Sequence, residues 1–533
     1  MIPRHHRLPS VSIAILLTLI TSAARAEVRL HNLFTDHMVL QRDARVPIWG
    51  WANDGEKVTV EFRGKKISTV ARDGKWMVRL NNLKAGGPDN LKVSGSNLIT
   101  VKDVLVGEVW IASGQSNMEW AMQSSFAPTA DIAGANEPLL RLFTVPKLKA
   151  DAPVENIKAS WELTSPNSVK GFSAVGYYFG QSLQKALGVP VGIIHTSWGG
   201  SPAEVWMRDQ VLAADPDYRR DILDVYPAQL KQYQTNLAAW EKEEAEAKAA
   251  KQEFKKWKPW PAWKPSELYN GMIAPLLPYA IQGAIWYQGE SNAGRAYQYR
   301  RLFADMIRNW RKDWGQGDFP FLAVQLAPFN PVNDQPVDSN WAELREAQVL
   351  ATKTLPSVGV AVITDYGNPT DIHPTWKKPV GERLALAARS IAYQEKLVYS
   401  GPMYRRMTVE GNTAILTFDH VGRGLIAGSP REEKEMASPV WEIVKTRQAG
   451  HANELVGFAV AGEDRKFVWA KAEIRGKKIA VSSPGVPKPV AVRYGWADCP
   501  VVNLFNAEGL PASPFRTDDW PMITAPKSVA AKK

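Results

Sequence analysis

Five apolar runs that alternate with amphipathic stretches constrain the fold more than any other feature of the sequence. They occupy residues 104–112, 189–195, 281–287, 319–327 and 358–365. Stretches with a helical period accompany most of them, at residues 177–187, 297–314, 342–354 and 380–392. Apolar strands bounded by helices favour a mainly parallel sheet that is covered on both faces. We therefore predict an α/β domain over residues 104–396.

The segments on either side of this domain read as short strands. Residues 27–103 contain strand patterns separated by turn signals such as Asn53-Asp54-Gly55, and residues 397–533 return to the same pattern. We predict an all-β module at each end of the α/β domain. Residues 212–265 interrupt the central rhythm with an Ala/Glu/Lys-rich helix at 241–256 that should face solvent. The Trp/Pro-rich stretch that follows either lines a ligand groove or clamps that helix to the body.

The first 26 residues have the pattern of a secretory signal peptide. Arg4 and Arg7 precede an apolar run at 11–20, and Ala24-Arg25-Ala26 fits a small-residue cleavage site. The run is too short to span a membrane, and no other stretch is long and apolar enough to do so. We expect a periplasmic or secreted protein. The single cysteine, Cys499, cannot form an internal disulfide, and we interpret it as structural.

Charge and aromatic content narrow the class of partner. The formal net charge is +11, but the basic residues are scattered, whereas a nucleic-acid-binding protein concentrates them in a stripe. We therefore expect no nucleic-acid partner. The chain has 21 tryptophans. Because the indole ring is broad, apolar and rigid, it suits stacking on sugar faces, and this favours a carbohydrate ligand.

Four turns carry polar residues that a buried strand would not tolerate. They lie at 114–118, 196–202, 286–292 and 371–374. The carboxyl ends of parallel strands line the ligand crevice of an open α/β sheet, so we expect these turns to converge. The first turn contains Ser116 but has Met118 where an ordinary α/β-hydrolase elbow has glycine.

A serine, a histidine and an acid among these turns point to nucleophilic acyl transfer. Only His195 and His373 fall within the α/β region; His195 ends an apolar run and fits a buried, hydrogen-bonded histidine. We predict Ser116 as nucleophile, His373 as general base and Asp371 as its orienting acid. The N–H groups of Ser116 and of Gly199 or Gly200, with a side-chain amide, would hold the oxyanion. No cluster has the spacing of metal ligands, so we predict neither metal nor cofactor.

The four turns together resemble the sialate O-acetylesterase family of the SGNH hydrolases, through segments 114–118, 197–200, 285–292 and 371–374. The resemblance implies a flavodoxin-like three-layer hydrolase domain with accessory β modules. It also implies Ser116 as nucleophile, His373 as base and Gly200 as the oxyanion glycine.

Two assignments stay open in the resemblance. Either Gln288 or Asn292 matches the amide donor. The wider pattern is Asp-x-x-His, but Thr370 stands three residues before His373 and Asp371 only two. Asp371 can reach the ring, because alternate side chains of an extended segment share a face. Glu290 is the rival acid, and without either carboxylate the site would be a Ser–His dyad.

These observations lead to one expected function and one alternative. We expect a carbohydrate O-acetylesterase that acts on O-acetylated sialic acid or on acetylated plant hemicellulose oligosaccharides such as xyloglucan or xylan. Trp198, Trp286 and Trp260 are the expected substrate-binding aromatics. The alternative is a non-catalytic carbohydrate-binding protein on an esterase scaffold.

Overall fold

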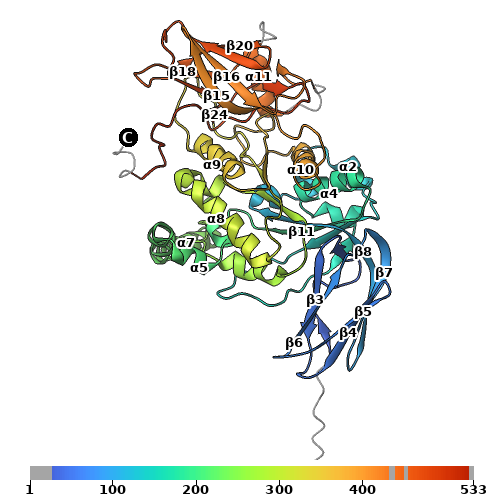
Figure 1. The fold of residues 1–533 in the computed structure, drawn as a ribbon. Coiled ribbons are helices and arrows are strands. Elements are labelled where there is room, and N and C mark those ends of the chain that lie inside the picture. Colours follow the sequence, from blue (N-terminus) through green and yellow to red (C-terminus); the bar gives the residue numbers. More distant parts are fainter. Residues whose placement is uncertain (1–26, 431–437, 449–453, 527–533) are drawn as a thin grey trace, which may run out of the picture.

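The computed structural model describes residues 27–430, 438–448 and 454–526. The predicted signal peptide, residues 1–26, lies outside the described residues. Figure 1 shows an N-terminal β module and a C-terminal β module at opposite ends of a central α/β domain. Within the described ranges, no helix combines the length and the apolar character that crossing a membrane requires.

The central domain is built on a sheet with the strand order β10-β9-β11-β8-β12-β13-β14. All pairings along this path are parallel except that of β10 with β9, so the predicted parallel sheet is present. The predicted apolar runs at 189–195, 281–287, 319–327 and 358–365 each contribute one strand. The bounds of the strands are β8 Leu98–Gly114, β9 Leu140–Thr144, β10 Trp161–Leu163, β11 Val191–Ser197, β12 Gly283–Tyr287, β13 Phe321–Val324 and β14 Val358–Ala361.

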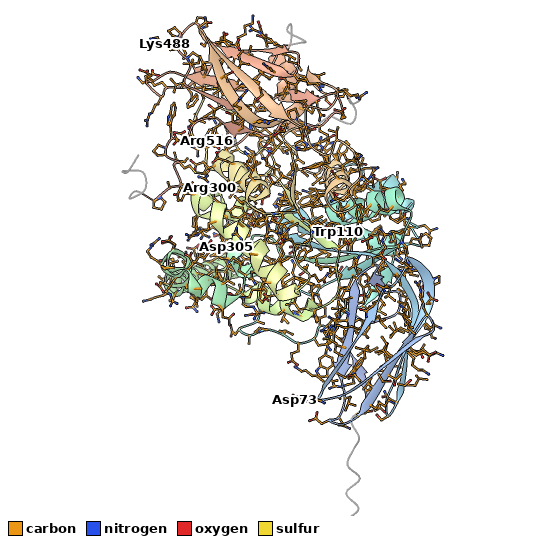
Figure 2. All side chains as sticks on the ribbon, in the orientation of Figure 1. Asp73, Trp110, Arg300, Asp305, Lys488 and Arg516 are labelled. Carbon is orange, nitrogen blue, oxygen red and sulfur yellow. The ribbon has the colours of Figure 1, made fainter. Side chains whose placement is uncertain are left out.

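Helices cover both faces of this sheet. Neighbouring residues along a strand point to opposite faces, and each face packs against its own pair of helices. Trp286 packs in the core shared with α8 and α9, whereas its neighbour Ile285 packs in the core shared with α4 and α10. Figure 2 marks Trp110 of β8 near the middle of the sheet, where it belongs to the second core. The four helices are α4 Ala174–Leu187, α8 Ala296–Trp314, α9 Asn340–Thr354 and α10 Lys377–Ile391.

One strand, β8, joins the central domain to the N-terminal module. Its first half pairs with β2 and β7, and its second half pairs with β11 and β12. The predicted boundary at residues 103–104 therefore falls inside a continuous 17-residue strand. The module's other strands are β1 Arg29–Leu30, β2 Val39–Gln41, β3 Arg45–Trp51, β4 Lys57–Phe62, β5 Lys65–Val70, β6 Lys75–Asn81 and β7 Gly86–Ser94.

The C-terminal module contains two four-stranded antiparallel sheets that share one apolar core. Leu416 from one sheet and Val492 from the other belong to that core. A helix that the sequence analysis did not predict, α11 Pro439–Gln448, lies in the same region. The two sheets comprise β15 Met403–Glu410, β16 Thr413–Asp419, β21 Lys478–Ser482 and β20 Lys471–Arg475, and β19 Val468–Trp469, β18 Phe458–Ala461, β22 Ala491–Tyr494 and β24 Phe515–Arg516. A further pair is β17 Leu425–Ala427 with β23 Leu504–Asn506.

The insertion at 212–265 contains the long helix α7, Tyr226–Ala249. None of its residues is buried, as expected for a helix that faces solvent. The helix starts and ends earlier than the predicted range 241–256, and residues 252–264 have no regular structure. Because three prolines and four aromatic residues crowd positions 254–265, the chain there cannot continue as a helix.

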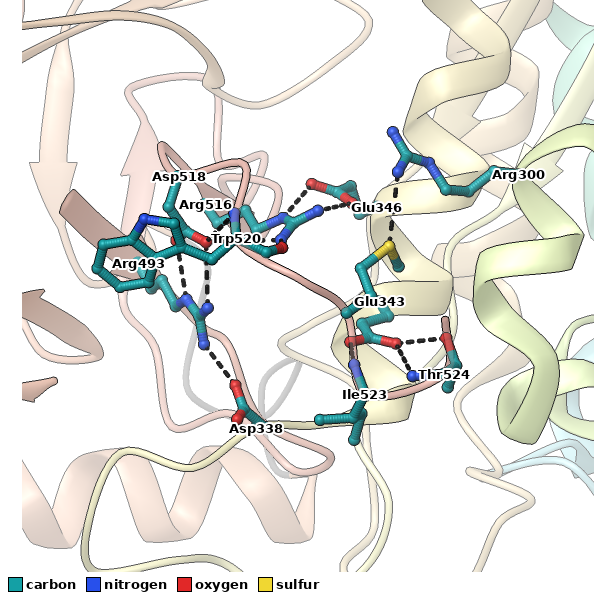
Figure 3. Close-up of polar contacts among 11 residues, drawn as sticks. Arg300, Asp338, Glu343, Glu346, Arg493, Arg516, Asp518, Trp520, Ile523 and Thr524 are labelled. Atoms are coloured by element: carbon teal, nitrogen blue, oxygen red, sulfur yellow. Dashed lines mark hydrogen bonds and ion pairs between the residues drawn. The ribbon is translucent and has the colours of Figure 1, made fainter. Parts of the chain in front are cut away.

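The C-terminal chain fastens its module to the central domain by charged contacts (Figure 3). Arg516 binds the Glu346 carboxylate through Nε at 2.8 Å, and Arg493 bridges Asp338 and Asp518. Beyond these ion pairs the chain runs along α9, where the buried Glu343 accepts hydrogen bonds from the backbone and hydroxyl of Thr524. The last described segment is therefore bound to α9 by hydrogen bonds.

The junction at β8 leads to a stability prediction. A Cβ placed on Gly107 would lie 1.9 Å from the carbonyl oxygen of Pro190, which the rigid sheet cannot move away. We expect Gly107→Ala to destabilise the protein by about 1–3 kcal/mol and to lower its melting temperature. Gly171→Ala is the matched control, since a Cβ there meets nothing within 4 Å. Equal melting temperatures for the two variants would contradict close packing at the junction.

Candidate active site

Ser116 is placed by a close approach of two strands. β8 ends at Gly114, whose φ is +139°, and a Cβ there would lie 2.1 Å from the carbonyl oxygen of Tyr287 at the end of β12. Only glycine fits this position, and the chain then turns so that Ser116 begins the short helix α1, Ser116–Glu119. Among the described residues, no acceptor binds the backbone N–H of Ser116.

His373 lies directly against this serine. Its Nε2 is 2.9 Å from Ser116 Oγ, so the first and fourth predicted turns meet. The Trp120 ring stacks on the imidazole with ring centroids 5.2 Å apart. Burial and the positive charge of Lys377 lower the pKa of His373 below its ordinary 6.5, and Asp371 opposes that shift. The lowered pKa favours the neutral imidazole, which is the form able to accept a proton.

Asp371 is the carboxylate beside the outer nitrogen of this ring. Its Oδ1 accepts the backbone N–H of His373 at 2.8 Å and lies 3.4 Å from His373 Nδ1. Its side chain is 49% exposed, so water competes for the same oxygen. Serine hydroxyl, imidazole and carboxylate thus stand in a row, an arrangement that can activate a hydroxyl as a nucleophile.

Glu290, the rival acid, points elsewhere. Its Oε1 accepts a hydrogen bond from Asn117 Nδ2 at 2.7 Å, and no hydrogen bond or ion pair joins it to His373 in the described chain. Burial raises the pKa of the Glu290 carboxyl, and the contact with Asn117 and the charge of Lys377 oppose this. In this geometry Asp371, and not Glu290, is the carboxylate that contacts the histidine.

The two predicted glycines differ in what their N–H groups do. Gly199 lies against the serine, since a Cβ on it would be 3.3 Å from Ser116 Cβ, but its N–H donates to Glu119 Oε2 at 2.6 Å. The N–H of Gly200, whose φ is +75°, has no acceptor within the part of the chain that is described. Of the pair, Gly200 therefore keeps a donor for a ligand.

The two predicted amides are buried and engaged. Gln288 Nε2 donates to Asn292 Oδ1 at 2.7 Å and to the carbonyl of Ser201 at 3.3 Å. Asn292 Nδ2 donates to Glu204 Oε2 at 2.9 Å. These contacts tie the third turn to the second, and they use amide hydrogens that the sequence analysis assigned to an oxyanion.

The three predicted tryptophans have different surroundings. Trp286 is 0% exposed and packs edge-on against Trp206 and Trp310, so the prediction that it binds substrate is corrected. A strand residue that points into a core has no surface for a ligand. Trp198 is partly exposed and packs edge-on against Trp263, whereas Trp260 is 79% exposed.

A groove of about 480 Å³ lies between the second turn and the insertion. Neither Ser116 nor His373 lines it; the groove approaches the serine through Gly200, the neighbour of the Gly199 that packs against Ser116. Gly200 and Ser291 line its near end, and the Trp260 ring would lie 3.0 Å from a Cβ on Gly200. The rest of the lining includes uncharged polar and aromatic side chains, Gln229, Gln232, Tyr233, Asn236 and Trp263. The Trp/Pro-rich stretch therefore lines a groove, and it also packs back on α7, where Trp240 Nε1 donates to the carbonyl of Lys256 at 2.9 Å.

Four site residues were missed by the sequence analysis: Gln115, Asn117, Glu119 and Lys377. Gln115 Oε1 accepts the N–H groups of Gly289 and Ser291, each at 3.3 Å, and so joins the first turn to the third. Lys377 Nζ donates to Asn117 Oδ1 at 2.5 Å from a buried position. No sequence signal marks this lysine, because a lysine at the start of a helix usually faces solvent.

The remaining candidates have structural surroundings. His195 is buried with Nε2 2.6 Å from Ser197 Oγ, and burial lowers its pKa to about 4, which fits the interpretation as a core histidine. Cys499 is a buried free thiol whose pKa burial raises to about 12. In the described ranges no group of three or more His, Cys, Asp or Glu residues is placed to hold a metal ion.

Comparison with known proteins adds three findings. A family described as "Carbohydrate esterase, sialic acid-specific acetylesterase" matches residues 245–389. Rat sialate O-acetylesterase is 30% identical over 436 residues, which cover 74% of this chain and 79% of the rat protein; the human protein is 29% identical over 77% of this chain and 81% of its own. The crystal structure of a carbohydrate acetylesterase from Xanthomonas citri is 40% identical, with a TM-score of 0.76, and the match covers 93% of this chain and all of that one.

Proposed function

Because this chain belongs to the sialate O-acetylesterase family of carbohydrate esterases, we propose that it hydrolyses acetyl esters on glycans through an acetyl-Ser116 intermediate. The observation that carries this mechanism is the 2.9 Å approach of His373 Nε2 to Ser116 Oγ at the carboxyl end of the sheet. A non-catalytic glycan-binding protein has no need of that pair.

The strand order supports an SGNH-type, flavodoxin-like domain. In chain order β11-β8-β12-β13-β14 reads 2-1-3-4-5, the order of flavodoxin-like doubly wound sheets. Such sheets bind ligands where the order reverses, between strands 1 and 3. Here these strands are β8 and β12, which lead into Ser116 and into the third turn.

The proposed reaction has two displacements. Ser116 Oγ attacks the acetyl carbonyl carbon while His373 Nε2 takes the hydroxyl proton. The proton then passes to the sugar oxygen, which leaves as an alcohol, and the acetyl group remains on Ser116. Water, activated by the same imidazole, attacks the acetyl group and releases acetate. Asp371 holds the ring and stabilises its protonated form.

We assign the oxyanion to the N–H groups of Ser116 and Gly200, which lack protein acceptors among the described residues. Gly199 is set aside because Glu119 occupies its N–H. In this assignment Gln288 and Asn292 hold the third turn in place and do not bind the oxyanion themselves.

The groove favours a neutral acetylated oligosaccharide, of the hemicellulose type (xyloglucan or xylan), over sialic acid. A sialate carboxylate calls for an available cation. Arg295, the cationic side chain of the lining, already binds Glu204 and donates to Gln298 Oε1. Exposed aromatic rings with amides between them suit uncharged sugar faces and hydroxyls.

The cellular location belongs to the same proposal. Plant polysaccharide fragments and glycans are met outside the cytoplasm, and the signal-peptide pattern of residues 1–26 is consistent with export to the periplasm or the medium.

The primary test is acetate release by Ser116→Ala. Without the nucleophile we expect kcat/KM on acetylated xyloglucan, acetylated xylan and O-acetylated sialic acid to fall by roughly 10⁴–10⁶-fold, with the melting temperature unchanged. An enzymatic assay of released acetate measures kcat/KM on each substrate. Full activity in the variant would refute the mechanism, and absence of release by the native protein from all three would favour the glycan-binding alternative.

The acid assignment is tested by comparing Asp371→Asn with Glu290→Gln. Asp371→Asn should lower kcat roughly 10²-fold, because the protonated imidazole loses its carboxylate. Glu290→Gln should cost less, since its amide oxygen can still accept from Asn117. Steady-state kinetics on 4-nitrophenyl acetate reports both. The reverse order of effects would assign the acid to Glu290.

The groove assignment is tested by Trp260→Ala. We expect KM for an acetylated oligosaccharide to rise roughly 3–10-fold from the lost stacking surface, and KM for 4-nitrophenyl acetate, which has no sugar face to stack, to change less. Trp257→Ala is the matched control, because Trp257 is 94% exposed and does not line the groove. Equal effects of both variants would remove the groove from substrate binding.

A further inference from the structure

A lysine is buried beneath the serine–histidine pair. Lys377 is the first residue of α10, and its Nζ lies 5.5 Å from the centre of the Trp120 ring and 5.3 Å from that of Tyr287. A buried cation is costly unless it is paired. Its direct partner is the neutral Asn117 side chain, whose Nδ2 in turn donates to the Glu290 carboxylate. Because burying this lysine is costly, we expect its contacts to have a function in the site.

The Asn117 side chain joins three of the four turns of the site, the first, third and fourth. Its Oδ1 accepts from Lys377, while its Nδ2 donates to Glu290 Oε1 at 2.7 Å and to the carbonyl of Ile372 at 3.0 Å. Ile372 and Lys377 stand on either side of His373 in the chain. One amide, on the residue next to Ser116, therefore holds both ends of the segment that carries the histidine.

We propose that Lys377 is a positioning residue, which acts through Asn117 to hold His373 against Ser116 and sets a positive charge behind the imidazole. This rests on the proposed function of Ser116 and His373. The lysine touches neither of them through a hydrogen bond, so its contribution comes through geometry and charge.

The charges around His373 give the proposal a pH signature. Asp371 faces the ring from its own turn, Lys377 from α10, and Glu290 faces Lys377 from the 3₁₀ turn η6, Glu290–Arg295; on α1, Glu119 is paired with Lys147. Burial lowers the pKa of Lys377 to about 7, against the pull of Glu290 and Asp371. Below that pH the lysine is charged and lowers the pKa of His373, which favours the neutral form of the base.

The test compares Lys377→Met with Lys378→Met. Methionine matches the length of the buried stem without charge or donor, and Lys378 is the neighbouring, half-exposed lysine that pairs with Asp131. On 4-nitrophenyl acetate we expect Lys377→Met to lower kcat roughly 10–100-fold with KM within about twofold, because the nucleophile and base lose alignment. The acid limb of kcat/KM should move to higher pH, since the histidine loses a neighbouring positive charge. Lys378→Met should change none of these.

A double-mutant cycle shows whether the lysine acts through the amide. Asn117→Ala should lower kcat to a similar extent, and adding Lys377→Met should cost little more. The proposal would be overturned if Lys377→Met kept the wild-type kcat and pH profile. It would also be overturned if the effects of the two substitutions on the activation free energy were fully additive. If Lys377→Met does not fold, Asn117→Ala decides alone, and unchanged kcat there overturns it. Ser116→Ala, assayed in parallel, separates the two failures: activity in that variant refutes the proposed function itself.

Discussion

The candidate site depends on the close approach of β8 and β12 at Gly114. A side chain at this position would collide with the Tyr287 carbonyl, 2.1 Å from where its Cβ would lie. Because glycine lets the two strands end side by side, Ser116 leaves one strand and the Gln288–Asn292 turn leaves the other at the same edge. Gln115 and Asn117, on either side of the serine, then bond to the third and fourth turns. The polar contacts between these turns therefore depend on the backbone contact at Gly114, which brings the turns together.

The C-terminal module is coupled to this site through α9. Glu343 and Glu346 bind the C-terminal chain (Figure 3), and Arg345 binds the carbonyls of Ala497 and Asp498. On its inner face the same helix presents Gln348, whose Nε2 donates to the carbonyl of Gln288 at 3.1 Å. The C-terminal module therefore holds α9 in place, and α9 in turn contacts the third turn of the site.

Much of the fold could be predicted because apolar periodicity survives in the strands and helices of a two-sided sheet. The range predicted as 177–187 lies within α4, which begins three residues earlier at Ala174, and 342–354 lies within α9, which begins two residues earlier at Asn340. β9 and β10 were missed, since strands of five and three residues lack a long apolar run. Trp286 was misjudged as a ligand-binding residue because alternation shows that a residue faces one side of a sheet but not whether a helix covers that side.

By itself the sequence determined the class of sheet, the four turns and the residue types at their tips, because local propensity and motif spacing are local properties of the chain. Tertiary structure alone decided which of two acids meets the histidine, which glycine keeps its N–H available, and that Lys377 lies buried under the site. These are distances between residues up to 260 positions apart. They follow from how strands and helices pack, and no single segment of the chain encodes them.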